Sequence, residues 1–277
     1  MAKRDNFTAV LNEAIEAMCA KGFDPTLAAY YAGQLRRAAA SKFKAGIATN
    51  DRMKRAMQAI YRRVAPAGAK VPRAASGLSL ITLQRLQPRL LALVNARILE
   101  STRLLKENHQ AALDKIEQRF TGWASSVPPQ GSRVDLAREA RDGIKKELRN
   151  LKYCENRVVI DQSHKLRSNM DDLLAIEGGA IAQQWHSHWR SPGYKYRKDH
   201  KERDMHFYLI RDSWAENKGL IKPDPSLPSG GQYTDQVTRP GEEVFCRCFG
   251  TNIFSLRDLP DAMLTDKGRA ELARVRG

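Results

Sequence analysis

The hydrophobic pattern changes its period at Gly178-Gly179, and this change limits the fold more than any other feature of the chain. Before the glycine pair, apolar residues recur every three or four positions, as they do on one face of an α-helix. After it, the residues from Ile181 to Trp189 alternate between two faces, as in a β-strand. The sequence therefore predicts an α+β protein, mainly α-helical in its N-terminal two-thirds, with a small mixed α+β C-terminal domain.

The first two predicted helices lie at the N-terminus. Residues 8–21 keep helical spacing and Gly22 ends them, while Asp24-Pro25 supplies the N-cap and first turn of a second helix. The apolar stripe expected on the second helix is Leu27, Tyr30, Tyr31 and Leu35.

A third helix is predicted from about Asn50 to Val64, with one apolar and one basic face. The apolar face carries Met53, Met57, Ile60 and Tyr61. The basic residues of the other face and of the segment that follows are candidates for DNA contact: Arg52, Lys54, Arg55, Arg62, Arg63, Lys70 and Arg73. A run of charges on a helix is also typical of a solvated surface, so both interpretations stand.

Two further helical regions are expected before the glycine pair. A long helix follows Pro88 and reaches about Phe120, and its length indicates a bundle or coiled-coil contact. Its expected buried side is Leu91, Val94, Ile98 and Leu105. Ser132 is expected to cap a helix whose inward residues are Leu136, Ala140, Ile144, Leu148 and Leu151, and a separate helix is expected over about 155–177.

These elements, together with a capped helix expected after Thr265, predict the organisation of the chain. The segments are a basic helical segment at 1–64, a linker at 65–79, a long-helix segment at 80–152, an α+β domain at 153–255 and a C-terminal helix at 256–277.

Positive charge is concentrated in the first half of the chain. Residues 1–150 hold 27 Lys and Arg against 13 Asp and Glu, whereas residues 151–277 hold 20 against 18. Nucleic acid is the commonest acidic partner of such a surface.

No apolar run is long enough to span a membrane, so no membrane partner is expected. The four scattered cysteines do not form a disulfide framework, which fits a reducing compartment.

Residues suited to chemistry gather between Trp185 and Cys248. The stretch holds three of the four Trp, four of the six His and two of the four Cys, so function is sought there first. A short strand is expected at 244–249, which places Cys246 and Cys248 on the same face. Such a pair can pack as small apolar residues, form a disulfide, or bind zinc with His200 and His206 as further ligands.

Arg197 and His200 lie one helical turn apart, so both can face one side of a short helix. Two interpretations stay open: the pair fixes a loop on the sheet, or His200 acts as a general base beside Arg197 as an anion clamp. No nucleophile or second carboxylate stands at a diagnostic spacing, and the common ATPase, dinucleotide, zinc-protease and serine-hydrolase motifs do not occur.

Residues 150–255 resemble the C-terminal domain of phage head morphogenesis proteins, the Mu F-like minor head (minor capsid) protein family. The resemblance consists of an Arg followed by helix, a Trp, an R-x-x-H, and then P-G and C-R-C. The matching residues are Arg157, Trp185, Arg197, His200, Pro240, Gly241, Cys246, Arg247 and Cys248.

The resemblance implies a non-enzymatic minor structural protein of a tailed-phage head. Such a protein acts at the portal during procapsid assembly in the host cytoplasm, then stays inside the virion beside packaged double-stranded DNA. Its expected partners are the portal protein, that DNA, other head proteins and further copies of itself. The alternatives are a nuclease or nucleotide-modifying enzyme that uses His200 and Arg197, and a sequence-independent DNA-binding protein. No cofactor is expected apart from the zinc considered above.

Overall fold

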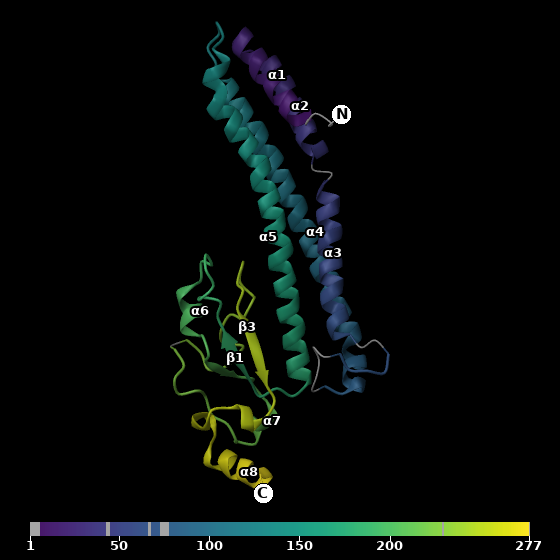
Figure 1. Ribbon diagram of the computed structural model, residues 1–277, viewed down its shortest axis with the longest axis vertical. Coiled ribbons are helices and arrows are strands. Elements are labelled where there is room, and N and C mark those ends of the chain that lie inside the picture. Colours follow the sequence, from purple (N-terminus) through teal and green to yellow (C-terminus); the bar gives the residue numbers. More distant parts are fainter. Residues whose placement is uncertain (1–5, 43–44, 66–67, 73–77, 229, 277) are drawn as a thin grey trace. The chain divides into compact units, whose positions relative to one another are not determined.

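The computed structural model describes residues 6–42, 45–65, 68–72, 78–228 and 230–276. It confirms the α+β class, since long helices precede a three-stranded antiparallel sheet with short helices (Figure 1). The chain divides into two compact units. We call them the helical unit (Met1–Arg55 and Ile98–Ile160) and the sheet unit (Ala56–Arg97 and Asp161–Gly277).

The helical unit begins with α1 (Asn6–Lys21) and α2 (Pro25–Lys42), which pack against each other (Figure 1). The prediction for this hairpin is confirmed at its turn, where Gly22 adopts φ +79° and the Asp24 carboxylate accepts a hydrogen bond from the Leu27 N–H. Tyr30 was wrongly placed in the apolar stripe, because it is exposed while Tyr31 and Leu35 take the buried positions.

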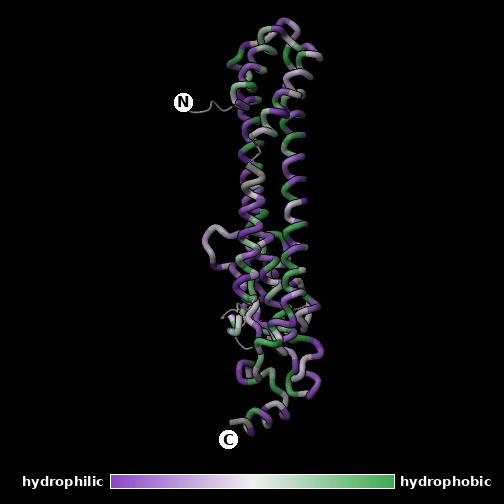
Figure 2. The backbone as a smooth tube through the Cα atoms, turned by 90° about the vertical axis from the view of Figure 1, so that its right-hand side faces the viewer, coloured by the Kyte–Doolittle hydropathy of each residue, from purple (hydrophilic) through white to green (hydrophobic). Residues whose placement is uncertain are grey.

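The core of the helical unit joins α1 and α2 to the parts of α4 and α5 that belong to this unit. Its buried residues include Phe7, Leu11, Ile15, Met18, Leu35, Ile116, Phe120 and Ile144. Hydrophobic residues recur at short intervals along the long helices in Figure 2, as expected for helices with one buried stripe.

Helix α4 (Leu80–Ala124) starts well before Pro88, so the prediction that the helix follows this proline is wrong. A proline inside a helix removes one backbone hydrogen bond and strains the preceding turn. Pro88 itself is exposed, while Leu83 and Leu86 before it and Leu90 after it are buried, and their burial stabilises the helix on both sides of the proline.

The predicted buried side of α4 is shifted by one residue at its start. Leu90 is fully buried, whereas Leu91, which was expected inside, is exposed. Val94 and Leu105 are buried as predicted.

Helix α5 (Arg138–Glu177) is continuous, so the prediction of two helices with a break near residue 153 is wrong. No glycine or proline interrupts it there, and helical packing continues on both sides. The expected cap at Ser132 is also wrong, because a 3-10 turn, η2 (Val134–Ala137), comes first and Leu136 is exposed. The Ser132 N–H instead bonds the Cys19 carbonyl.

The glycine pair ends α5 as predicted. Gly179 adopts φ +75°, its N–H bonds the Ile176 carbonyl, and the Ala180 N–H bonds the Ala175 carbonyl. These two bonds form a Schellman motif, which only a residue that tolerates a left-handed conformation can complete. The chain turns there directly into the first strand.

The sheet has β1 (Ala182–His186) at its centre, with β2 (Phe207–Leu209) and β3 (Phe249–Ile253) antiparallel on either side. Figure 1 shows β1 and β3 side by side. The strand expected over 244–249 is therefore wrong, since β3 starts at Phe249. Phe245 has a left-handed backbone (φ 60°), which keeps the preceding residues in a turn.

Short elements complete the sheet unit. They are α6 (Lys198–Glu202), α7 (Trp214–Asn217), the 3-10 turns η3 (Leu256–Asp258) and η4 (Asp261–Met263), and α8 (Asp266–Arg276). Their apolar residues and the sheet share a core that includes Ile181, Leu209, Leu220, Ile253, Leu256 and Met263. The predicted cap of α8 is confirmed, because the Thr265 hydroxyl accepts a hydrogen bond from the Gly268 N–H.

Within the described ranges, no helix combines the length and the apolar character needed to cross a membrane.

Candidate metal centre

Three segments of the sheet unit bring the motif residues together. Strand β1 carries Trp185, helix α6 carries His200, and the turn before β3 carries Cys246 and Cys248. All four side chains are buried. The Trp185 and His200 rings meet edge to face with their centres 5.2 Å apart, so the tryptophan forms one wall of the cluster.

His200 directs one ring nitrogen at both thiols. Its Nδ1 lies 3.5 Å from the Sγ of Cys246 and 3.5 Å from the Sγ of Cys248. His200 and Cys246 are each 1% exposed and Cys248 is 4% exposed. These three residues form the group of candidate metal ligands in the described part of the chain.

Hydrogen bonds around the two thiols shift their pKa values in opposite directions. The bond from Cys248, helped by His200 and by the Gly241 N–H, lowers the pKa of Cys246 although burial opposes this. The same bond, together with burial, raises the pKa of Cys248. These contacts make Cys246 the more acidic thiol of the pair. Both cysteines are free, so the disulfide interpretation does not hold in this structure.

A carboxylate lies on the other side of the imidazole. The His200 Nε2 is 3.5 Å from Oε2 of Glu243 and 3.8 Å from Oδ2 of Asp199. Arg197 pairs with the Glu243 carboxylate and donates a 3.0 Å hydrogen bond to the Val244 carbonyl. The R-x-x-H pair therefore acts through Glu243, a residue that the sequence analysis did not single out.

The turn that carries the thiols is fixed to α5. Ser168 donates a hydrogen bond to the Pro240 carbonyl, and Asp161 accepts one from the Phe245 N–H at 2.6 Å. Gly241 lies between these anchors with φ +83°, and its N–H donates to the Cys246 Sγ at 3.3 Å. Nothing in the sequence marked Asp161 and Ser168, because both read as ordinary polar positions of a helix.

Other predicted site residues lie outside the cluster. His206 was a candidate zinc ligand, but its Nδ1 faces Asp224 at 3.5 Å and the Ser226 hydroxyl at 3.2 Å. Its position at the end of the turn before β2 takes it away from the thiols. The Arg247 guanidinium lies over the Tyr194 ring. Arg157 belongs to the helical unit, where it covers and hydrogen-bonds Tyr153.

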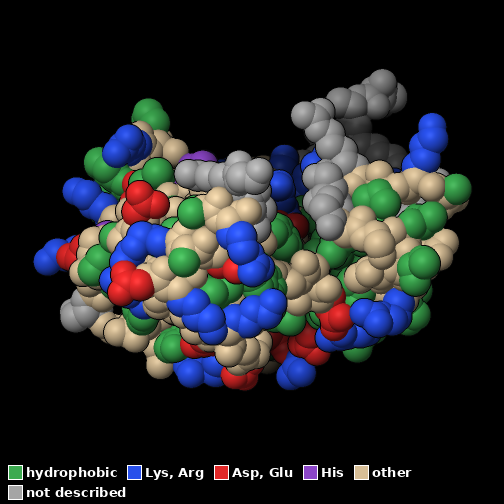
Figure 3. Space-filling model, turned by 90° about the horizontal axis from the view of Figure 1, so that it is seen from below, with side chains coloured by type: hydrophobic (Ala, Val, Ile, Leu, Met, Phe, Trp, Pro, Cys, Tyr) green, Lys and Arg blue, Asp and Glu red, His purple; other side chains and the backbone are tan. Residues whose placement is uncertain are grey.

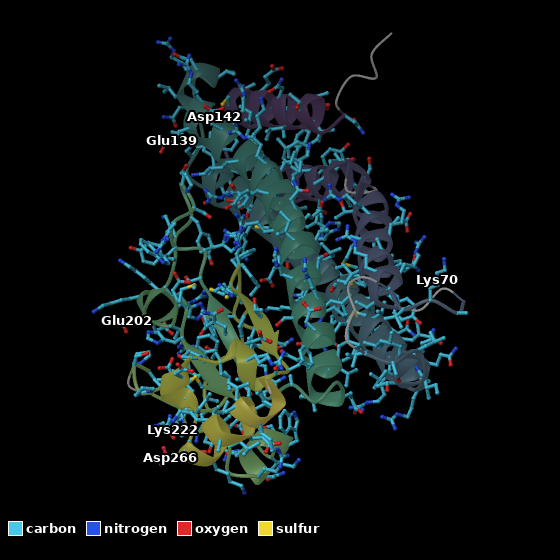
Figure 4. The ribbon with its side chains drawn as sticks, turned by 60° about the horizontal axis from the view of Figure 1, so that its bottom comes forward. Lys70, Glu139, Asp142, Glu202, Lys222 and Asp266 are labelled. Carbon is cyan, nitrogen blue, oxygen red and sulfur yellow. The ribbon has the colours of Figure 1, made fainter. Side chains whose placement is uncertain are left out.

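The candidate DNA-contact residues lie on α3 (Ala45–Val64) and in the segment after it. Met53 and Met57 are buried as predicted. The basic side chains of the helix, Arg52, Lys54, Arg55, Arg62 and Arg63, are exposed, and Arg52 also donates to the Asn156 side chain at 2.5 Å. Lys70 extends away from the ribbon in Figure 4, and Arg73 lies outside the described residues.

The cluster is suited to holding a soft metal ion more than to attacking a large substrate. It combines two sulfur ligands and an imidazole in a buried site, which is the ligand chemistry of zinc. Comparison of the chain with protein-family models, with curated proteins and with solved structures finds no match.

Proposed function

We propose that this chain is a minor structural protein of a tailed-phage head, without catalytic activity. It acts at the portal during head assembly in the host cytoplasm and is retained in the virion near packaged DNA. One observation carries the proposal: four residues of the head-protein motif that are far apart in the sequence, Trp185, His200, Cys246 and Cys248, meet in one buried cluster. Motif residues that contact one another in the fold support the family resemblance more strongly than the same residues matched along the sequence alone.

Burial of the cluster favours a structural role over the enzymatic alternative. A nuclease or nucleotide-modifying enzyme must present its general base to a nucleic acid or nucleotide. His200 is almost completely buried beneath Trp185 and the cysteine turn, and Arg197 is engaged with Glu243. This arrangement suits a fixed turn better than a reacting group.

The start of α4 provides a surface for docking on the portal. Ile81 is 78% exposed and Leu91 is 45% exposed, although the same helix buries Leu83 and Leu90 fully. These exposed apolar side chains near the start of α4 are available for contact with a partner. The proposal assigns this surface to the helical portal.

The test is the composition of the particles. Phage heads assembled with the full chain should contain it in a low and constant copy number, measured by mass spectrometry of purified particles. A host DNA-binding protein or a nuclease would not co-purify with heads in fixed proportion. Heads that form normally without this chain inside them would overturn the proposal.

A pair of variants tests the docking surface. Ile81→Asp with Leu91→Asp places two charges on it and should reduce incorporation into heads at least about tenfold, since burying an unpaired carboxylate at an interface is costly. Gln84→Asp with Asn95→Asp adds the same charge at exposed polar positions of the same helix and should be incorporated normally. Equal incorporation of both variants would exclude this surface as the docking site.

A further inference from the structure

We infer that the sheet unit binds one zinc ion through Nδ1 of His200 and the sulfur atoms of Cys246 and Cys248. The ion fixes the turn at 240–248 to helix α6. This inference does not depend on the head-protein proposal, because it rests only on atoms within the sheet unit.

The spacing of the three ligand atoms fits a tetrahedral zinc ion. With Zn–S near 2.3 Å and Zn–N near 2.05 Å, the nitrogen and each sulfur of such a site are about 3.6 Å apart. Nδ1 of His200 lies 3.5 Å from both sulfur atoms. All three ligand atoms lie within 4.8 Å of one another, so they are close enough to hold one ion.

The orientation of the imidazole also matches that of a metal ligand. A histidine that binds a metal through one nitrogen usually presents the N–H of the other to a carboxylate. Here Nε2 faces Glu243 at 3.5 Å, and Arg197 pairs with that carboxylate. This gives the R-x-x-H spacing a purpose, since Arg197 orients the carboxylate that orients His200.

The charges of the site balance when zinc is present. Two thiolates and a neutral imidazole around Zn²⁺ have no net charge, so such a group can be buried at little electrostatic cost. The Gly241 N–H, 3.3 Å from the Cys246 sulfur, is placed to stabilise a thiolate. Because His206 lies elsewhere, the described residues provide three ligands to the ion.

Zinc content of the purified full chain is the direct test. After expression with added zinc and removal of loosely bound ions, elemental analysis should find about one zinc per chain. Cys246→Ser and Cys248→Ser should each lose most of it, whereas Cys154→Ser and His206→Asn should keep it, because Cys154 is exposed and His206 faces Asp224. Wild-type protein that holds no zinc, even after incubation with zinc chloride, would overturn the inference, as would equal loss in the control variants.

Cobalt gives a measurement that does not depend on whether the cysteine variants fold. Wild-type chain titrated with Co²⁺ should develop a sulfur-to-cobalt charge-transfer band in the near ultraviolet, and zinc should abolish it. Glu243→Gln keeps the size of the side chain but removes its charge, and should weaken zinc binding about 10- to 100-fold. The absence of a charge-transfer band would contradict the proposed ligand set, and unchanged affinity in Glu243→Gln would contradict the role of Glu243 in orienting His200. Normal particle content with no zinc would reject this inference and leave the head-protein proposal standing.

Discussion

At the scale of the residue, Asp224 shows how one carboxylate holds a loop against a strand. Its Oδ1 accepts hydrogen bonds from the Ser226 N–H at 2.9 Å and the Ser226 hydroxyl at 2.5 Å. Its Oδ2 accepts one from the Phe207 N–H at 3.2 Å, at the start of β2, and lies beside His206. Burial by itself raises the pKa of a carboxyl group, but the Ser226 and Phe207 hydrogen bonds and His206 together lower the pKa of Asp224.

The lowered pKa predicts how the stability contributed by Asp224 depends on pH. Since the folded pKa lies below the unfolded value of about 4, the carboxylate stabilises the fold above that pH. This contribution is lost as the pH falls through the folded pKa. Asp224→Asn should therefore lower the free energy of unfolding by about 1–3 kcal/mol at pH 7, and by less near pH 3. Urea unfolding followed by tryptophan fluorescence at both pH values measures the difference.

The control for this prediction is Glu202→Gln. Glu202 lies on α6 (Figure 4), and 51% of its side chain is exposed. Its replacement should leave the free energy of unfolding close to that of the parent at both pH values. A destabilisation of Asp224→Asn that is equal at pH 7 and pH 3 would show that size and shape, not charge, explain the effect.

The residues of the cluster could be predicted only in part. The coincidence of Arg197, His200 and the two cysteines in one short stretch was visible, because each residue type is rare and chemically specific. Glu243 was not singled out, although it stands three residues before Cys246, because carboxylates are common on surfaces and carry no signal alone. Its role depends on which way the turn directs its side chain, and that is set by contacts with α5.

At the scale of the element, Gly268 decides how closely α8 approaches the core. A Cβ atom at this position would lie 2.1 Å from the Leu220 carbonyl oxygen. That carbonyl also accepts the hydrogen bond from the Thr265 N–H that starts the helix. Gly268→Ala should therefore push α8 outwards and lower the free energy of unfolding of the sheet unit by about 1–3 kcal/mol.

The matched control is Gly122→Ala in α4, where a Cβ atom would meet nothing within 4 Å. Alanine favours a helix over glycine by up to about 1 kcal/mol, so this variant should be slightly stabilised. Thermal unfolding measures both changes, and hydrogen exchange of α8 shows whether the loss is local. If Gly268→Ala were as stable as Gly122→Ala, α8 would not depend on this close contact.

The elements that the sequence predicted well are those with a local cause. The Schellman end at Gly179 and the caps at Asp24 and Thr265 each follow from a few neighbouring residues. The errors have tertiary causes. Pro88 is tolerated inside α4 because Leu83, Leu86 and Leu90 are buried before and after it, and the cysteines leave the strand because anchors on α5 hold the turn.

At the scale of the whole molecule, the uneven distribution of charge is the feature that local contacts do not explain. The net charge of +16 arises almost entirely in residues 1–150. On the face shown in Figure 3, Lys and Arg side chains are interspersed with Asp and Glu, so that face does not form a continuous basic patch. The arginines and lysines of α3 are exposed and remain the candidates for contact with DNA.

We expect the full chain to bind duplex DNA of any sequence, with an affinity that falls as salt is added, because each contact with a phosphate releases counterions. Replacing Arg55, Arg62 and Arg63 of α3 by Glu should weaken binding at every sequence. If all three contact phosphates, the slope of log affinity against log salt should fall by about 3. Fluorescence anisotropy with a labelled short duplex at several salt concentrations measures the slope.

A control of equal charge separates contact from long-range attraction. Lys195, Lys198 and Lys222 are exposed residues of the sheet unit, and their replacement by Glu changes the net charge by the same amount. This variant should reduce affinity at low salt through the field of the whole protein but leave the salt slope nearly unchanged, because no phosphate contact is lost. If both variants lowered the slope equally, DNA would bind the protein without preference for α3. If neither did so, the basic face of α3 would be a solvated surface, and packaged DNA would not be its partner.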